Sequence, residues 1–391
     1  MTKTIGAASV IALGAFALTA CGAADAPAAD GDVDTTCAIA DDIVIGMVNE
    51  QSGGSFFAGV GVLEGAETAI EEINETGYLG DGVTLSIEVA DTASETDRAS
   101  AETTKMLNNP DVMAVIGPAS SQSAIAVAPA VGKAQVPTIF TQAGSEGVVI
   151  NDWTFRATPP TGTYYNSVVE WVADNGYKTV SVIYNGTFPT FAEMGKTQIP
   201  ELANELGLEI LSSQEVQSTT QDYTNQAQVI ANENPDAVIM LILPAPSITF
   251  MNQLRDAGYK GQIVGTPSQA GGMVADGGAA VEGIVYPVAF TPAMEDEDAK
   301  NFVKLFGSAY DGRLPNTYNA EGYDAIWWIA HGIKETGCST REGIQEGLVA
   351  VGNAGFAAAQ GRSGLTFVDG HDVRVEGTVV TWANGEESLV E

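Results

Sequence analysis

Strand-length apolar runs alternate with segments of helical period from Ile43 onward, and no other feature constrains the fold of this chain so strongly. Apolar runs predict strands at residues 43–48, 83–89, 112–116 and 138–140, with helices near 60–74, 95–108 and 121–133. Strands and helices that alternate in this way form right-handed βαβ units, whose strands lie parallel in one sheet. The sequence therefore predicts an α/β fold in which helices cover a parallel sheet.

A second series of the same kind follows Pro159 and Pro160, which exclude a helix and predict a crossing between lobes. Its strands are expected at 180–184, 209–211, 237–243 and 263–264, and its helices near 163–175, 190–206, 221–233 and 247–257. A strand at 283–290 and helices at 294–310 and 318–336 are expected to lead back to the first lobe, and 366–382 to form strands. Because so long a chain exceeds what one hydrophobic core organises, we expect two doubly wound lobes.

The N-terminus has the pattern of a secretory signal. Lys3 precedes an apolar run that begins at Ile5, is too short to span a bilayer comfortably, and leads through small residues to Cys21. This pattern resembles the signals of bacterial lipoproteins, in which the cysteine is acylated and becomes the first residue of the mature protein. The alternative is an ordinary signal peptide cleaved at an Ala-x-Ala site. We expect a signal peptide at 1–20, a lipid on Cys21 and a flexible linker at 21–41.

Acidic residues outnumber basic ones by 50 to 16, which gives a formal net charge of −34. This charge repels nucleic acid and anionic lipids, so a lipid anchor is the expected membrane contact. The two histidines, His331 and His371, stand apart and no thiols cluster, so we expect no metal. The spacing of Gly59, Gly61 and Gly65 differs by one residue from a dinucleotide fingerprint, and no catalytic motif occurs. We expect neither a cofactor nor catalysis.

Three loops rich in glycine and hydroxyl groups follow predicted strands of the first lobe, at residues 52–57, 117–121 and 141–145. Open parallel sheets bind ligands at the carboxyl ends of their strands, where these loops would meet. Hydroxyl and backbone N–H groups at a helix N-terminus can hold a carboxylate or carbonyl without a fixed positive charge. Ser121 alone would be read as a helix cap, but three converging loops predict a binding site.

The order of several motifs resembles the branched-chain amino acid binding family of type I periplasmic binding proteins of ABC transporters. The motifs are Ser52-Gly53, Phe57, Gly65-Ala66, Ala69-Ile70, Ile73-Asn74, Val115-Ile116-Gly117-Pro118, Ser120-Ser121, Pro137, Phe155-Arg156, Gly322-Tyr323-Asp324-Ala325, Phe367 and Asp369-Gly370. The resemblance implies two doubly wound, Rossmann-like lobes with a three-segment hinge. It implies an N-terminal lobe of residues 42–157 with 288–362 and a C-terminal lobe of 158–287 with 363–391. The family captures a solute by hinge closure and passes it to an ABC permease and its ATPase.

Carried over to this chain, the resemblance places the ligand in the cleft between the lobes. A ligand carboxylate would meet Ser121 and the third loop, while aromatic side chains would form apolar walls. The expected ligand-binding residues are Phe57, Ser120, Ser121, Gln142, Ala143, Ser145, Phe188 and Pro267, with Phe191 beside Phe188.

The chain has Gly265-Thr266-Pro267-Ser268 where amino-acid binders of this family place a carboxylate for the ligand ammonium. A buried, unpaired ammonium is costly, so we expect a ligand without an amino group unless Asp276 or Asp324 substitutes. The sequence does not distinguish among branched-chain amino acids, amides and related carboxylates as the ligand. We expect a monomeric, lipid-anchored, extracytoplasmic solute-binding component of an ABC importer. The alternative is a ligand-sensing receptor domain that docks on a signalling partner.

Two cysteines, Cys37 and Cys338, remain once Cys21 is assigned to the lipid. On the fold that the resemblance implies, both fall at the end of the first lobe away from the cleft. The compartment outside the membrane permits oxidation, so we predict a disulfide between them, with two free thiols as the alternative.

Overall fold

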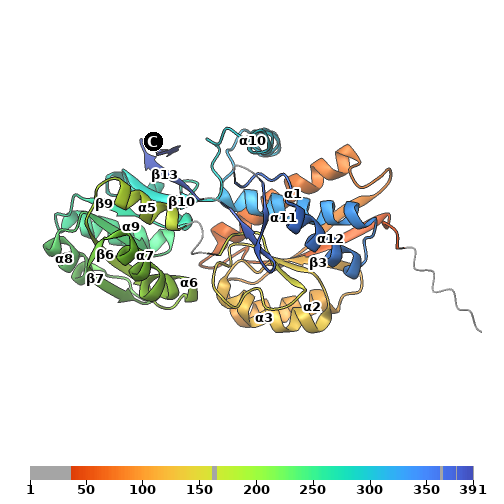
Figure 1. The fold of residues 1–391 in the computed structure, drawn as a ribbon, viewed down its shortest axis with the longest axis horizontal. Coiled ribbons are helices and arrows are strands. Elements are labelled where there is room, and N and C mark those ends of the chain that lie inside the picture. The colour runs from red at the N-terminus through yellow and green to blue at the C-terminus, as the bar shows by residue number, and fades with distance from the viewer. Residues whose placement is uncertain (1–36, 161–164, 362–363, 376, 391) are drawn as a thin grey trace, which may run out of the picture. The chain divides into compact units, whose positions relative to one another are not determined.

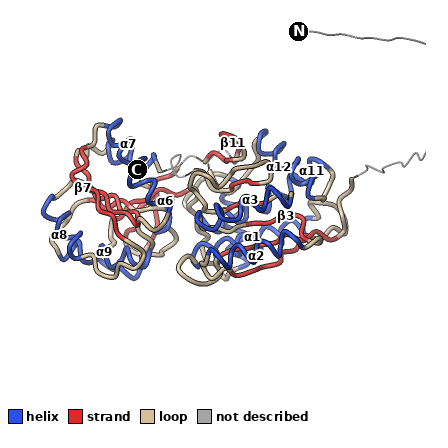
Figure 2. Tube along the Cα trace, turned by 90° about the horizontal axis from the view of Figure 1, so that it is seen from below, coloured by secondary structure: helices blue, strands red, loops and turns tan. Residues whose placement is uncertain are grey.

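The computed structural model describes residues 37–160, 165–361, 364–375 and 377–390. The predicted signal peptide, Cys21 and most of the predicted linker lie outside these residues. The described chain forms two seven-stranded sheets with helices on both faces (Figure 1, Figure 2). The predicted α/β architecture of two doubly wound lobes is therefore confirmed.

The first lobe has the strand order β11-β12-β5-β4-β3-β1-β2, and only β11 and β12 pair antiparallel. Reading β2-β1-β3-β4-β5 gives the doubly wound order in which the chain reverses direction across the sheet between β1 and β3. The elements are β1 (Asp42–Asn49), α1 (Phe56–Thr76), β2 (Thr84–Asp91), α2 (Thr96–Asn108), β3 (Val112–Ile116), α3 (Ser121–Ala134), β4 (Thr138–Phe140), β5 (Thr154–Arg156), α10 (Glu297–Ala309), α11 (Thr317–Thr336), α12 (Arg341–Ala354), β11 (Thr366–Asp369) and β12 (Asp372–Arg374).

The second lobe repeats the same strand order as β7-β6-β8-β9-β10, and β13 and β14 extend it antiparallel. Its reversal point lies between β6 and β8. The elements are α5 (Asn166–Asp174), β6 (Thr179–Asn185), α6 (Pro189–Glu193), the π-helical turn η1 (Met194–Gln198), α7 (Ile199–Leu206), β7 (Glu209–Val216), α8 (Thr224–Glu233), β8 (Ala237–Leu241), α9 (Pro244–Asp256), β9 (Gln262–Val264), the 3₁₀ turns η2 (Pro267–Gln269) and η3 (Ala275–Ala280), β10 (Ile284–Val288), β13 (Thr378–Ala383) and β14 (Glu386–Leu389).

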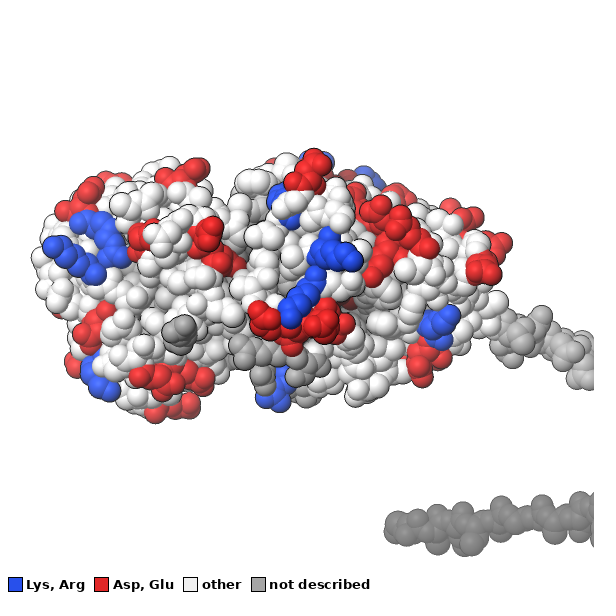
Figure 3. All heavy atoms as spheres, turned by 90° about the horizontal axis from the view of Figure 1, so that it is seen from above, with Lys and Arg blue, Asp and Glu red and all other residues white. Residues whose placement is uncertain are grey.

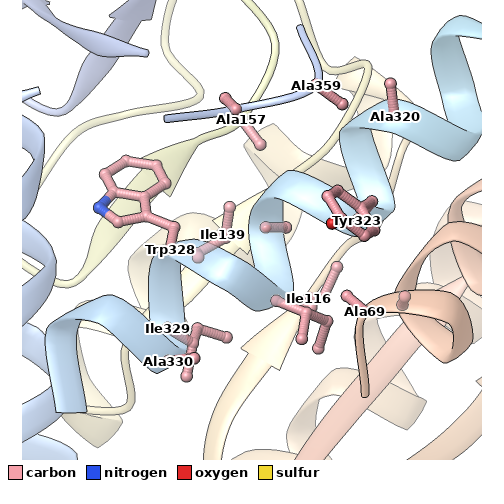
Figure 4. Close-up of a cluster of buried hydrophobic side chains, with 14 of the residues drawn as sticks. Ala69, Ile116, Ile139, Ala157, Ala320, Tyr323, Trp328, Ile329, Ala330 and Ala359 are labelled. Atoms are coloured by element: carbon pink, nitrogen blue, oxygen red, sulfur yellow. The ribbon is translucent and has the colours of Figure 1, made fainter. Parts of the chain in front are cut away.

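The central strands are apolar throughout because both faces of each sheet are covered. In the first lobe, α1, α11 and α12 pack on one face of the sheet, and α2 and α3 lie on the other (Figure 1). The larger core joins α1 and α11 to the strands, and Figure 4 shows Ala69, Ile116 and Trp328 within it.

Helices α1 and α11 cross closely because glycines face backbone at their contact. A Cβ atom at Gly65 would collide with the carbonyl of Asn319, and one at Gly322 with the carbonyl of Val62. Both glycines stood in the motif series that predicted the family. Their role is to bring α11, which follows the second crossing, against the first helix of the lobe.

The chain passes between the lobes three times, after β5, after β10 and between Arg374 and Thr378. The last passage corrects the expectation that residues 363–391 belong to the second lobe, because β11 and β12 complete the first sheet. Arg156 on β5 explains this placement. Its Nε and Nη2 atoms donate to the carboxylate of Asp372 on β12 at 2.7 and 2.9 Å.

Cys37 and Cys338 form the predicted disulfide, with their Cα atoms 5.2 Å apart. Cys37 precedes β1 and Cys338 follows α11, so the bond lies near the amino end of β1. The carboxyl end of β1 leads toward the candidate site described next. The disulfide therefore lies at the amino end of β1, and the candidate site lies beyond its carboxyl end.

Candidate functional site

A cavity of about 270 Å³ lies where the carboxyl ends of β1, β3, β6 and β8 approach each other. These are the strands that flank the reversal point of each sheet, the place where open α/β sheets bind ligands. Loops that follow β1, β3 and β4 supply the first-lobe wall, and segments after β6, β8 and β9 supply the second-lobe wall. We call this space the interlobe cleft.

A cluster of three hydroxyl groups connects the two walls of the interlobe cleft. The Oγ1 atom of Thr190 on α6 lies 2.8 Å from Ser121 Oγ and 2.6 Å from Ser145 Oγ. The backbone N–H of Ser145 donates to Ser121 Oγ at 3.2 Å, which holds the second and third first-lobe loops together. One threonine of the second lobe thus contacts two loops of the first.

A buried carboxylate, that of Glu50, shapes the loop that precedes α3. Its oxygens accept hydrogen bonds from the backbone N–H groups of Ala119 at 3.1 Å and Ser120 at 3.2 Å. Burial raises the pKa of the Glu50 carboxyl, although these two donors oppose the rise. Ser120 caps α3 by accepting from the N–H of Ser123 at 3.2 Å. The backbone donors of this loop before Ser121 are therefore largely satisfied within the protein.

A second buried carboxylate fixes Gln142, which follows β4 and has a positive φ of 37°. Glu321 on α11 accepts from the backbone N–H and from the side-chain amide of Gln142, both at 3.1 Å. Burial raises the pKa of the Glu321 carboxyl to about 8, against the opposing effect of the Gln142 N–H. The contact stabilises an unusual backbone conformation at the wall of the cleft.

Aromatic rings from both lobes line the cleft. Phe57 and Tyr318 meet edge to face in the first lobe with centroids 5.5 Å apart, and Phe188 and Phe191 do so in the second lobe at 6.0 Å. Tyr165 also lines the cavity.

Two tyrosine hydroxyls tie this wall to the backbone of the second lobe. Tyr318 donates to the carbonyl of Pro267 at 3.2 Å, and Tyr165 donates to that of Gly265 at 3.0 Å. The cleft is thus largely apolar with a few fixed polar groups, as small-molecule sites usually are.

Six of the eight predicted ligand-binding residues line the cavity: Phe57, Ser120, Ser121, Gln142, Phe188 and Pro267. The predicted neighbour Phe191 lines it too. The other two lie just behind the wall. Ala143 is fully buried and its carbonyl accepts from Arg156 at 2.8 Å, while Ser145 is 2% exposed and reaches the cleft through Thr190.

Neither acidic residue considered as an ammonium partner lies in the wall of the cleft. Asp276 is exposed on η3. Asp324 is fully buried on α11, where the N–H groups of Ala359 and Gln360 donate to its carboxylate at 2.7 and 2.9 Å. Their positions therefore exclude both residues as partners for a ligand ammonium in the cleft.

The sequence analysis missed Thr190, Tyr165 and Tyr318. Thr190 stands between the two phenylalanines that were singled out, so the segment was found without its polar member. Tyr318 lies in the first turn of α11, and the Oδ1 atom of the helix cap Asn316 accepts from the Tyr318 N–H at 3.0 Å. No local pattern marks any of the three as facing a cavity, because the neighbours of each are distant in the sequence and, for Thr190 with Ser121 and for Tyr318 with Pro267, come from the other lobe.

Two features of the described residues concern membranes and metals. None of the described helices has the length and apolar character needed to traverse a bilayer. The described residues also contain no group of three or more acidic, histidine or cysteine side chains placed to bind a metal ion.

Several proteins of known structure share this fold. No curated protein matches the sequence. Similar solved structures include a leucine-binding protein, LivK, from Thermotoga maritima, with 24% identity, a TM-score of 0.81, and coverage of 89% of this chain and 98% of the other. LivJ from Streptococcus pneumoniae, in complex with isoleucine, has 23% identity, a TM-score of 0.79, and coverage of 89% and 99%.

A solute-binding protein of an ABC transporter from R. palustris, in complex with benzoate, has 19% identity, a TM-score of 0.79, and coverage of 89% and 95%. These likenesses concern the fold. The family model for periplasmic binding proteins matches residues 42–386, nearly all of the described chain. The chain therefore belongs to the periplasmic binding protein family, whose members bind solutes.

Proposed function

We propose that this protein is the extracytoplasmic solute-binding component of an ABC importer, held at the membrane by a lipid on Cys21. Membership of the periplasmic binding protein family supports the solute-binding role, and similar structures carry transporter names. The partners would be a permease and its ATPase, and the protein would act as a monomer. No covalent chemistry is part of the proposal.

The observation that carries the proposal is the hydroxyl cluster across the interlobe cleft. Thr190 contacts Ser121 at 2.8 Å and Ser145 at 2.6 Å, so opening the cleft must break both hydrogen bonds. Three chain crossings connect the lobes, an arrangement that allows hinge motion about short segments. A solute that fills the cavity contacts both walls at once and thus favours the closed arrangement.

The test measures solute-dependent stabilisation and closure in the full-length protein. Amino acids, amides and aliphatic and aromatic carboxylates are screened by thermal shift, and hits are examined by small-angle scattering. A solute at one hundred times its dissociation constant stabilises the folded state by about 2.7 kcal/mol. We expect a binder to raise the melting temperature and to lower the radius of gyration.

Two variants at one position relate closure to the hydroxyl cluster. Thr190→Val keeps the shape of the side chain and removes the hydroxyl, so we expect it to weaken solute binding about tenfold, whereas Thr190→Ser retains most of the affinity. Equal affinities for both variants would contradict the role of the cluster.

Deletion of the gene then separates transport from sensing. Loss of uptake of the bound solute supports the importer role, whereas normal uptake with an altered response to the solute supports the receptor alternative. If no compound in the panel stabilises the protein or changes its scattering, the solute-binding proposal is wrong.

A further inference from the structure

We infer that the interlobe cleft takes an apolar carboxylate, aromatic or branched aliphatic, that carries no ammonium group. This inference rests on the proposed function and names its substrate class. It is carried by the kind of polar groups that the cleft offers to a ligand, and by the apolar surface around them.

The polar end of the cleft offers hydrogen-bond donors in excess. Ser121, Ser145 and Thr190 have three hydroxyl hydrogens, but the two O···O contacts among them use only two. One hydroxyl hydrogen is therefore left for an acceptor. Ser121 and Gln122 open α3, and the described residues provide no acceptor for their backbone N–H groups. A ligand group at this end must accept hydrogen bonds.

A carboxylate meets this requirement and an ammonium does not. A carboxylate only accepts hydrogen bonds, and a helix N-terminus next to it is electrostatically favourable. An ammonium only donates, so it would be repelled by the two N–H groups that open α3 and would find only neutral hydroxyl oxygens as acceptors. Its charge would also be left uncompensated, since the residues that line the described cavity include no acidic side chain.

The carboxylates closest to the wall, two of them buried and one half-buried, do not supply the missing partner. Glu50 is committed to the N–H groups of Ala119 and Ser120, and Glu321 to those of Gln142. Asp91, at the end of β2, accepts from Ser52 Oγ at 2.7 Å and from three backbone N–H groups. None of these three carboxylates, those of Glu50, Glu321 and Asp91, lines the interlobe cleft.

The remaining surface fits an apolar body. Phe57 and Tyr318 face the cavity from the first lobe, and Phe188, Phe191 and Met194 from the second. Aromatic faces also attract cations, so a quaternary ammonium is the rival ligand that this surface would accommodate. The donor-rich polar end opposes that rival, because such a cation accepts no hydrogen bond.

The experiment is calorimetric titration of the full-length protein with matched pairs of ligands. One pair is 4-methylpentanoate and leucine, and the other is 3-phenylpropanoate and phenylalanine, so each pair differs by the amino group alone. Benzoate and choline are titrated separately. We expect the acid of at least one pair to bind ten or more times more tightly than its amino acid, and choline to show no binding.

The outcomes separate the two proposals. Tighter binding of leucine or phenylalanine than of the matched acid overturns the inference and leaves the solute-binding function standing. Binding of choline in preference to the acids overturns it as well. Absence of binding by every acid, amino acid, amide and cation tested overturns the proposed function, and the inference falls with it.

A carboxylate introduced into the wall of the cleft tests whether the lack of an acidic side chain there is what disfavours a ligand ammonium. Ser268 lines the second-lobe side of the cleft and is 8% exposed. Ser268→Asp supplies a carboxylate, and Ser268→Asn has nearly the same shape without the charge. We expect Ser268→Asp to raise the ratio of leucine to 4-methylpentanoate affinity at least tenfold relative to Ser268→Asn. An equal ratio in the two variants, both shown to be folded by circular dichroism, overturns the electrostatic argument.

Discussion

Glu321 couples the wall of the cleft to pH. Burial raises the pKa of its carboxyl to about 8 from the ordinary value of 4.5. The folded state therefore retains a proton that the unfolded state releases above about pH 4.5, so the contribution of this group to stability is lost as pH rises toward 8. Asp324, one turn away on α11, acts in the same direction because burial raises its pKa to about 7.

The variant Glu321→Gln isolates this effect, because the amide resembles the protonated acid and does not titrate. We expect the free energy of unfolding of the variant, relative to the wild type, to rise between pH 5 and pH 8 by on the order of 2 kcal/mol. Denaturant titrations at the two pH values measure the difference. A difference that does not change with pH would show that Glu321 is ionised in the folded protein.

Single residues were predictable where a local pattern determines their position. Ser121 and Gln142 follow strands of one parallel sheet, and the carboxyl ends of such strands meet at one edge. Thr190 and Tyr318 follow no such rule. Thr190 meets Ser121 and Ser145 only because the lobes approach each other, and Tyr318 reaches Pro267 for the same reason. Contacts between lobes leave no periodic signal in the sequence.

Among the structural elements, the start of β1 and the end of α11 are joined by the Cys37–Cys338 disulfide, which spans 301 positions of sequence. A bond that closes so long a loop restricts the unfolded chain and is worth about 4 kcal/mol. We expect a reducing agent to lower the melting temperature of the wild type and to leave solute affinity unchanged, because the bond is remote from the cleft. Differential scanning calorimetry with and without reductant checks this.

The double variant Cys37→Ser/Cys338→Ser is the control for that measurement. Its melting temperature should lie near that of the reduced wild type and should not respond to the reductant. An equal decrease in both proteins would show that the reductant acts elsewhere. A lower solute affinity in the double variant would show that the two ends of the first sheet are coupled.

Elements with a clear apolar run or helical period were predicted, including the three-residue strand β4, whereas α12 and β5 were missed. Helix α12 was missed because three glycines lower its helix propensity, although Thr340 caps it by accepting from the N–H of Gly343 at 3.2 Å. Gly347 in this helix lies against Gly332 of α11, where a Cβ atom would collide. Strand β5 contains a single apolar residue, Phe155, between Thr154 and Arg156, so it shows no apolar run.

The whole molecule is strongly acidic, and this charge affects how it meets a membrane. The formal net charge is −34, and Figure 3 shows acidic side chains spread over both lobes on the face displayed. Anionic headgroups repel such a surface at physiological ionic strength, with a screening length of about 8 Å. Electrostatic adsorption to an anionic bilayer is therefore unfavourable for this protein, and none of its described helices offers a span.

Attachment under the proposed function depends on Cys21 alone. Each methylene group of an acyl chain that is buried in the bilayer contributes about 0.8 kcal/mol to the free energy of membrane binding, and this contribution does not depend on salt.

We expect the wild type to stay in the membrane fraction through a wash with 1 M salt and to be released by detergent. Cys21→Ser should appear in the soluble fraction with its solute affinity intact, since the cleft lies within residues 54–318. Cys37→Ser is the matched control, because it replaces another cysteine of the same chain, one that forms a disulfide with Cys338, and should leave the protein membrane-bound. Retention of Cys21→Ser in the membrane fraction, or release of the wild type by salt, would mean that something other than the lipid holds the protein there.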